Sequence, residues 1–371
     1  MKYYVIAGEA SGDLHGSNLI KALQEEDVNA EFRVWGGDLM DDCGVQLVKH
    51  YRDLAFMGFI EVLLNLRTIT KNLAFCKQDI AAYQPDIVIF IDYPGFNLRI
   101  AKWAKKMGFA THYYISPQIW AWKENRIQAI KRDVDKMYVI LPFEKSFYED
   151  KHNFPVEFVG HPLIDAISNR QQVDEYQFRA ENELSEKPII ALLPGSRKQE
   201  IKKMLNVMLS LVDHYEDYQF VIGGAPGLSE EFYTRFIENS RVHFVHNKTY
   251  DLLSVSTAAL VTSGTATLET ALFKVPQVVC YKGSWVSYQI GKRLVKNIDY
   301  ISLVNLIMNK TVVTELIQDN FNRKRLKQEL DLLLDNYQRT KFFLNYYDLE
   351  KVLGGRGASK KVAKLIFNSI N

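Results

Sequence analysis

Residues 1–16 have the sequence MKYYVIAGEASGDLHG, in which a short apolar run leads into a glycine-rich loop and then into a predicted helix over 16–26. Glycine permits a sharp turn after a strand and lets a ligand approach the backbone amides at a helix start, where the helix dipole favours anions. The loop differs from GxGxxG, and a tight turn without a ligand explains it equally well. Gly8, Glu9 and Ser11 are therefore candidate ligand-binding residues of a strand-to-helix turn.

Similar apolar runs alternate with stretches of helical spacing along the whole chain, which predicts parallel sheets covered by helices on both faces. The first series of predicted strands covers 3–7, 32–35, 87–91, 111–115 and 136–140, with helices at 16–26, 97–107 and 124–131. The second series covers 188–193, 219–222, 242–245, 258–262 and 277–281. We expect an α/β protein with two doubly wound, Rossmann-like domains that join near residue 165 and face each other across a cleft.

Length and composition limit the class of protein. A chain of 371 residues is long enough for two domains. Its 46 Lys and Arg against 44 Asp and Glu leave a formal charge of +2, which argues against nucleic acid as the main partner. The three cysteines, Cys43, Cys76 and Cys280, are too far apart for a CxxC motif or a disulfide framework.

The same composition predicts where the protein works. No apolar stretch approaches the roughly 20 residues that span a bilayer, and the glycine loop follows the first residues too closely for a signal peptide. We expect a cytoplasmic protein without a cofactor. The absence of HExxH, of Cys/His clusters and of DxD-type carboxylate pairs predicts no metal site.

The segment IDYPGFN at 91–97 places a carboxylate at the end of a predicted central strand. Open α/β sheets bind ligands at this end of their strands. The five apolar residues before Asp92 would help to keep its carboxylate out of water, and such a carboxylate can act as a general base. Asp92 could instead cap the helix that begins near Asn97 or hold the Pro94-Gly95 turn.

In the second half, LLPGSR at 192–197 is a strand that runs into a Pro-Gly turn. The planar guanidinium of Arg197 suits bidentate binding of a diphosphate, with the Ser196 hydroxyl and free amides beside it. A solvated surface arginine is the alternative interpretation.

The segment VTSGTATLE at 261–269 has the pattern of a strand, a turn of small residues and a helix start. The amides and hydroxyls of Ser263, Gly264 and Thr265 could bind a phosphate, and Glu269 could accept hydrogen bonds from a ribose diol. Glu269 could also serve as a capping-box carboxylate. Two loops suited to anions in one domain predict a nucleoside-diphosphate site without a Walker lysine.

Two further features have both a functional and a structural interpretation. His161 follows Gly160 at the end of the first series of strands, where it is either a residue of the cleft or a structural histidine. The segment MGFIEVLLNLRTI at 57–69 is apolar nearly all round a helix. It predicts either a buried helix or a patch that meets membrane or lipid.

Taken in order, nine segments of the chain resemble the lipid-A-disaccharide synthase family of bacterial glycosyltransferases, which have the GT-B fold. These segments are AGEASGDLHG at 7–16, MGFIEVL at 57–63, IDYPGFN at 91–97, HYYISPQIWAWKENR at 112–126, LPFEKSFY at 141–148, FVGHPLID at 158–165, LLPGSRKQEI at 192–201, SGTATLET at 263–270 and KRLVKNIDYISLVNLI at 292–307. Each is modest alone, but the ordered set is specific.

The resemblance implies an inverting transfer of 2,3-diacylglucosamine from its UDP donor to the 6-hydroxyl of 2,3-diacylglucosamine 1-phosphate, which gives a β-1,6-linked disaccharide and UDP. It implies that Asp92 is the base, that Arg197 meets the diphosphate, and that Asn305 completes the nucleotide pocket. It further implies an N-terminal acceptor-binding and catalytic-base domain (1–165), a C-terminal UDP-sugar-binding domain (166–340) and a helical tail (341–371) that could pack on the first domain.

Both substrates carry acyl chains. An exposed apolar surface at Ile60, Val62, Leu63 and Leu66 could therefore contact these chains or the membrane that holds them. We therefore expect peripheral contact with the cytoplasmic face of the inner membrane, and the resemblance suggests a homodimer.

Two alternatives remain at this point. A UDP-N-acetylglucosamine 2-epimerase would share the architecture and the nucleotide half without needing an acceptor. A non-catalytic nucleotide-sugar binding or scaffold protein would not need a carboxylate at a strand end.

Overall fold

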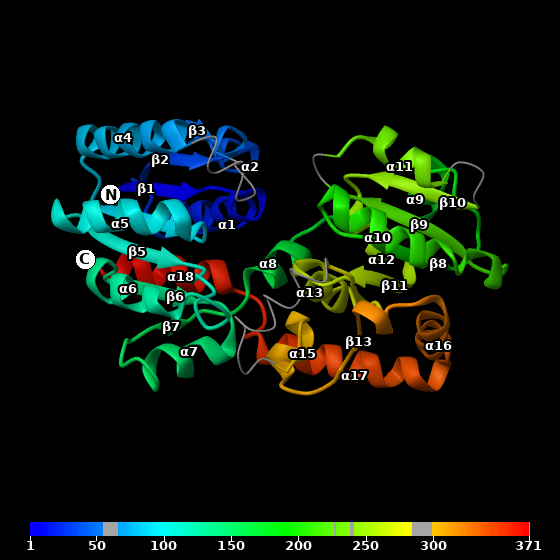
Figure 1. Ribbon diagram of the computed structural model, residues 1–371. Helices are drawn as coiled ribbons and strands as arrows, with labels where there is room; N and C mark the ends of the chain where they lie inside the picture. The colour runs from blue at the N-terminus through cyan, green and yellow to red at the C-terminus, as the bar shows by residue number, and fades with distance from the viewer. Residues whose placement is uncertain (55–65, 226–227, 238–240, 284–298, 371) are drawn as a thin grey trace. The chain divides into compact units, whose positions relative to one another are not determined.

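The computed structural model describes residues 1–54, 66–225, 228–237, 241–283 and 299–370. The chain divides into two compact units, which are residues 1–169 with 353–371 and residues 170–352. Both chain termini belong to the first unit (Figure 1). Each unit is built around one parallel sheet, as the alternating pattern predicts.

The first unit has a seven-stranded sheet in the order β3-β2-β1-β4-β5-β6-β7. Its strands are β1 (Lys2–Ala7), β2 (Glu31–Gly36), β3 (Gln46–His50), β4 (Ile87–Ile91), β5 (Ala110–Tyr114), β6 (Lys136–Val139) and β7 (Glu157–Phe158). Its helices are α1 (Ala10–Glu26), α2 (Asp38–Asp41), α4 (Leu66–Tyr83), α5 (Pro94–Lys106), α6 (Ile127–Asp133), α7 (Pro142–Glu149), α8 (Pro162–Ser168) and α18 (Ala358–Asn368), with short 3₁₀ turns η1 (Tyr51–Asp53) and η2 (Glu124–Arg126).

The second unit has a six-stranded sheet in the order β10-β9-β8-β11-β12-β13. Its strands are β8 (Ile189–Leu193), β9 (Gln219–Gly224), β10 (Val242–His246), β11 (Ser256–Thr262), β12 (Gln277–Tyr281) and β13 (Thr314–Ile317). Its helices are α9 (Glu175–Glu181), α10 (Lys198–Leu209), α11 (Glu230–Ile237), α12 (Thr249–Ser254), α13 (Thr265–Leu272), α15 (Leu303–Met308), α16 (Arg323–Leu334) and α17 (Asn336–Val352), with 3₁₀ turns η3 (Val212–His214) and η4 (Gln318–Asn320).

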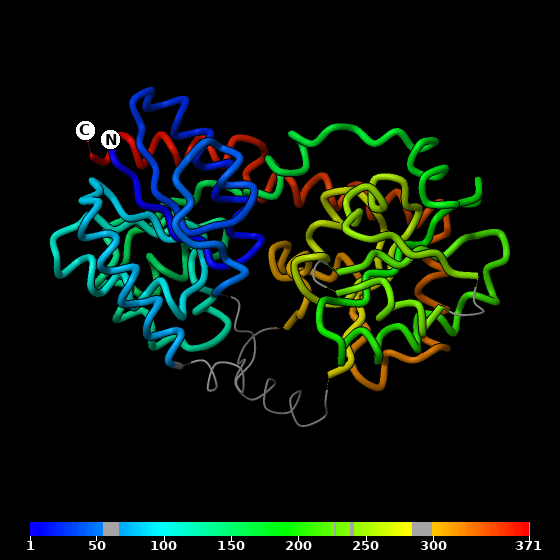
Figure 2. The backbone as a smooth tube through the Cα atoms, turned by 90° about the horizontal axis from the view of Figure 1, so that it is seen from above, coloured from blue at the N-terminus to red at the C-terminus, as the bar shows by residue number. Residues whose placement is uncertain are grey.

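Successive residues of a strand point to opposite faces of its sheet. In these strands both sets of residues are apolar, so helices cover both faces of each sheet. In the second unit, Ile190 and Leu192 pack towards α10, α11 and α16, whereas Ile189 and Ala191 pack towards α9 and α12. In the first unit, α1 packs against α8 and against the C-terminal helix α18, which is red in Figure 2. The predicted α/β class with two doubly wound sheets is confirmed. Three strands escaped prediction, namely β3, β7 and β13.

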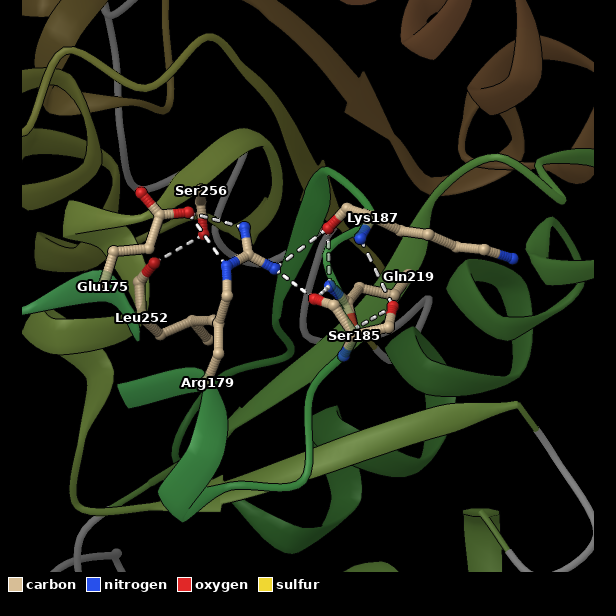
Figure 3. Close-up of polar contacts among 7 residues, drawn as sticks. All are labelled: Glu175, Arg179, Ser185, Lys187, Gln219, Leu252 and Ser256. Carbon is tan, nitrogen blue, oxygen red and sulfur yellow. Dashed lines mark hydrogen bonds and ion pairs between the residues drawn. The ribbon is translucent and has the colours of Figure 1, made fainter. Parts of the chain in front are cut away.

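Buried polar contacts fasten α9 to the second sheet (Figure 3). The Arg179 guanidinium pairs with Glu175 and donates to the carbonyl oxygens of Ser185 and Lys187. Gln219, at the start of β9, donates to the same two carbonyls at 2.7 and 2.5 Å. The two side chains thereby satisfy the backbone of the segment that enters β8, since a buried carbonyl without a partner would be costly.

The strand order reverses between β1 and β4 in the first unit, and between β8 and β11 in the second. At such a switch point the connections leave on opposite faces of the sheet and the carboxyl ends of the two strands stay uncovered. Ala7 pairs with Ile91, and Leu193 pairs with Val261. The loops singled out in the sequence therefore begin side by side, two in each unit.

Asp13 fixes the loop beside the first switch point, and its removal is predicted to destabilise the protein. Its buried carboxylate accepts from the backbone amides of Gly37 at 2.7 Å and of Leu39 and Met40 at 3.1 Å each. In Asp13→Ala these amides lose their acceptor, so we expect a loss of about 2–3 kcal/mol in the free energy of unfolding. Denaturant unfolding measures it. Asp42→Ala removes an exposed carboxylate nearby and should change little, and equal stability of both variants would contradict the assignment.

Candidate active site

Asp92 directly follows β4 at the first switch point, in an uncommon backbone conformation. Asp92 and Tyr93 both have left-handed φ angles, 43° and 48°. Residues other than glycine rarely adopt this region, and such strain clusters at functional sites. The backbone amide of Asp92 donates to the Tyr114 carbonyl at 3.1 Å. Its carbonyl accepts from the Tyr113 hydroxyl at 2.5 Å and from Asn97 Nδ2 at 2.8 Å.

These contacts use the backbone of Asp92, and its carboxylate has a hydrogen bond only from the adjacent Tyr93 amide among the interactions that affect its pKa. The N-cap residue of α5 is Tyr93, and this helix start has no side-chain cap. Burial raises the pKa of Asp92 to about 6, and the negative charge of Glu9 contributes in the same direction. A carboxylate with a pKa near 6 is ionised at neutral pH and is a better proton acceptor than an ordinary aspartate. A raised pKa is a property that a general base requires.

The glycine loop after β1 allows the neighbouring loop to approach closely. A Cβ atom on Gly8 would lie 2.3 Å from Cδ1 of Tyr93, so the Tyr93 ring occupies the space that any other residue at position 8 would need. Tyr93 in turn donates to the Leu54 carbonyl at 3.2 Å. Glu9 and Ser11 are exposed at the start of α1, and the charge of Glu9 acts on Asp92. Gly8, Glu9 and Asp92 therefore form one site in the first unit.

His161 has a structural role. It is buried at the N-cap of α8, where its Nδ1 atom accepts from the Leu163 amide at 3.2 Å. Burial lowers its pKa to about 3, and the neighbouring His15 adds to this effect. Its own amide donates to the Leu353 carbonyl at 2.9 Å. A neutral histidine engaged in a helix cap fits the structural interpretation.

The second switch point holds a pocket of about 300 Å³. Its walls come from the ends of β8, β9 and β11 and from the first residues of α13. The lining residues are Leu193, Gly195, Ser196, Glu200, Gly223, Ala225, Thr249, Thr262, Ser263, Gly264, Thr265, Ala266 and Glu269. A Cβ on Gly223 would lie 2.8 Å from Cδ2 of Leu193, so glycine keeps this wall open. Backbone amides in the first turn of a helix have no helical partner and favour an anion.

Glu269 supplies an acidic group to the pocket. Its carboxylate accepts from the Tyr250 hydroxyl at 2.6 Å, and burial raises its pKa. Arg170 stacks on the Tyr250 ring, with its guanidinium carbon 5.5 Å from the ring centroid, and pairs with Asp251. Sequence reasoning missed Tyr250, because nothing in the pattern of α12 indicates that one of its side chains meets Glu269.

The structure brings five of the predicted nucleotide-binding residues together, namely Ser196, Ser263, Gly264, Thr265 and Glu269. Arg197 is not among the lining residues of the described chain. Its side chain is 75% exposed, and one guanidinium nitrogen lies 3.3 Å from the carboxylate of Glu200.

Asn305 also lies outside the lining set of the described residues. It is fully buried, and its amide binds the segment that leads into β13. Nδ2 donates to Val313 O and Glu315 Oε1, both at 2.9 Å, and Oδ1 accepts from the amides of Val312 and Val313. A side chain so fully bonded supports the protein backbone rather than a nucleotide.

Three of the predicted acyl-chain residues, Ile60, Val62 and Leu63, lie outside the described residues, and for Leu66 only the backbone at the start of α4 is described. Among the described helices none is both long and apolar enough to cross a bilayer. Within the described part of the chain, no three His, Cys, Asp or Glu side chains gather as metal ligands would.

Comparison with known proteins identifies relatives over nearly the full length. Residues 3–363 match the family model described as lipid-A-disaccharide synthetase. The lipid-A-disaccharide synthase of Geobacter metallireducens is 39% identical over 99% of this chain and 96% of its own. That of Syntrophus aciditrophicus is also 39% identical, over 99% and 97%.

Among solved structures, the UDP-GlcNAc 2-epimerase from Neisseria meningitidis bound to UDP-GlcNAc superposes with a TM-score of 0.72, covering 99% of this chain and 100% of that one. Its sequence is only 12% identical, so this likeness concerns the fold alone.

The electrostatic coupling between Glu9 and Asp92 predicts a shift in the titration of Asp92. In Glu9→Gln the repelling charge is gone, so the Asp92 carboxylate should ionise at lower pH than in the wild type, where its pKa is about 6. Carboxyl carbon NMR, with Asp92→Asn to identify the resonance, measures both values. Ser11→Ala changes a neutral neighbour and should leave the titration in place. An unchanged midpoint in Glu9→Gln would show that burial alone raises the pKa.

Proposed function

The chain belongs to the lipid-A-disaccharide synthetase family and is a glycosyltransferase, and we propose that Asp92 and the pocket of the second unit carry its reaction. The enzyme transfers 2,3-diacylglucosamine from a UDP donor to diacylglucosamine 1-phosphate. One observation supports this assignment of residues: Asp92, with its raised pKa, lies at the switch point of the first sheet, and a pocket lined by small residues and a helix start lies at that of the second.

The proposed mechanism is a single displacement with inversion. Asp92 accepts the proton of the acceptor 6-hydroxyl as that oxygen bonds to the anomeric carbon of the donor, and the bond from this carbon to the UDP oxygen breaks. Protonated Asp92 then returns its proton to solvent. The reaction needs the residues of both units at the same sugar carbon when it occurs.

The pocket of the second unit is proposed to hold the UDP part of the donor. Its small residues at 263–265, with the start of α13, would bind the phosphates through amides and hydroxyls. Glu269, held by Tyr250, would accept hydrogen bonds from the ribose diol. Arg197 is retained as a diphosphate contact, which requires its side chain to turn away from Glu200. We do not retain Asn305 as a nucleotide contact, because its amide is already fully bonded within the protein.

Contact with the cytoplasmic face of the inner membrane and a homodimeric state are the remaining parts of the proposal. Both rest on the resemblance of the sequence to the family, and the acyl chains of both substrates support the first. Vesicle flotation of the wild type and of Leu63→Ser/Leu66→Ser tests membrane contact, and unchanged partitioning of a folded variant would remove the 57–69 segment from that role.

Loss of the base should abolish transfer without abolishing donor binding. We expect acceptor-dependent UDP release by Asp92→Asn to fall about 10²–10⁴-fold, as for loss of a general base. Release is measured with UDP-diacylglucosamine, with and without diacylglucosamine 1-phosphate. Full activity of the variant would remove Asp92 from the chemistry.

The same assay separates the alternative functions. Release of UDP, or conversion of the UDP-sugar, without acceptor would indicate a hydrolase or an epimerase on the same fold. A binding protein would show no turnover and no effect of Asp92→Asn.

The contact between Tyr250 and Glu269 should matter for UDP affinity. Tyr250→Phe removes the hydroxyl that orients Glu269, so we expect the Kd for UDP to rise about 3–10-fold, the equivalent of one hydrogen bond. Isothermal titration calorimetry measures it, with the exposed Tyr176→Phe as the matched control. Equal affinities of the two variants would show that Glu269 is not held for the ribose by Tyr250.

A further inference from the structure

The loop between β5 and α6, residues 115–126, begins at the same sheet edge as Asp92. Tyr114, the last residue of β5, pairs with Ile91 and accepts a hydrogen bond from the Asp92 amide at 3.1 Å. The chain then turns sharply, because Ile115 has a left-handed φ of 63°. The β5–α6 loop therefore leaves the sheet directly beside the proposed base.

The first half of this loop is held rigidly by α7. Glu144 is buried and accepts from the Ser116 hydroxyl at 2.6 Å, as well as from the amides of Ile140 and Leu141. The Tyr148 hydroxyl donates to the Pro117 carbonyl at 3.3 Å. Trp120 packs edge-on against Phe143, with ring centroids 4.8 Å apart. Because these contacts fix residues 116–120, the second half of the loop starts from a defined position.

The second half of the loop presents two cations around an exposed aromatic ring. Trp122 is 50% exposed. Lys123 Nζ lies 4.2 Å from the centroid of its ring, and the guanidinium carbon of Arg126 lies 5.9 Å from it. We call these three residues the WKR cluster. Cation–π contacts hold the charges near the ring without neutralising them.

The positive charge of the WKR cluster is not balanced locally. The one carboxylate of this part of the loop, Glu124, binds Lys151 at 2.7 Å and His152 at 3.0 Å instead. Within the described chain, no carboxylate oxygen lies within 4.0 Å of Lys123 or Arg126. Two adjacent cations without a carboxylate partner create a local positive potential, which suits an anionic ligand.

The field of Arg126 reaches Tyr113, whose hydroxyl contacts the backbone of the proposed base. Burial and the charge of Asp92 raise the pKa of Tyr113 well above its ordinary value, whereas Arg126 lowers it. The Tyr113 hydroxyl donates to the Asp92 carbonyl at 2.5 Å. Tyr113 thus interacts with both Asp92 and Arg126, and the loop that carries Arg126 leaves the sheet from the strand paired with the one that ends at Asp92.

We propose that Lys123 and Arg126 bind the phosphate monoester of the acceptor, with Trp122 as the fixed surface that holds the two cations. The inference rests on the proposed function, since it assigns the acceptor to the first unit. A phosphate monoester carries nearly two negative charges and three strong acceptor oxygens at neutral pH, which matches a guanidinium and an ammonium group. The donor carries its phosphates in the UDP part, so this contact distinguishes acceptor from donor.

The test compares Lys123→Gln/Arg126→Gln with the wild type in phospholipid-free, non-ionic detergent micelles. We expect the KM for diacylglucosamine 1-phosphate to rise about 10–100-fold, while the KM for the UDP donor and kcat stay within about twofold. The preference for this acceptor over one that lacks the phosphate should shrink by the same factor. Lys131→Gln/Arg132→Gln makes the same change of charge in α6 and should behave as the wild type.

Several results would overturn the proposal. These are an acceptor KM within twofold of the wild type, a fall in kcat alone, or an equal effect in the control variant. Loss of binding to phosphatidylglycerol vesicles with an unchanged acceptor KM would assign the two cations to bilayer headgroups instead. If the wild type itself released no UDP on addition of acceptor, the proposed function would fail rather than this contact.

Discussion

The reversal of strand order beside β1 and β8 is the constraint on which both sites depend. Crossovers between parallel strands are right-handed, so connections that run in opposite directions along the sheet must lie on opposite faces. The order of the strands reverses between β1 and β4, and again between β8 and β11, so the connections leave the carboxyl ends of these strands on opposite faces. One set of loops in each unit begins there, and Asp92, Gly8, Glu9 and the small residues at 263–265 lie on those loops or at the helix start that follows.

The two switch points have opposite chemistry. In the first unit, two carboxylates lie together, and their mutual repulsion and burial favour the uptake of a proton by Asp92. In the second unit, amides and hydroxyls at the start of α13 suit phosphate oxygens. A displacement reaction requires both, because one oxygen loses a proton while another gains negative charge.

Three buried carboxylates of the first unit each accept hydrogen bonds that fix a loop or a helix start. Asp13 holds the amides of the loop that enters α2, and Glu144 holds the start of the β5–α6 loop. Asp165 likewise accepts from the amides of Gly357 and Ser359, and these bonds hold α18 against the rest of the first unit. Each binds backbone or hydroxyl donors from a distant segment, so each converts a loop of no regular structure into a fixed support.

The sequence by itself determined the parallel sheets, the position of Asp92 at the end of a central strand, and five of the residues that line the second pocket. Short apolar runs that alternate with stretches of helical spacing indicate buried parallel strands, and the loops that follow such strands gather at one edge of the sheet. The structure alone decided which polar side chains are free. Asn305 is bonded inside the protein, Arg197 turns to Glu200, and Tyr250 reaches Glu269 from another helix. The partly exposed edge strand β3 and the two-residue edge strand β7 carry too weak an apolar pattern to be found. Hydrogen-bond partners depend on distances between segments far apart in the chain, and local pattern contains no information on those distances.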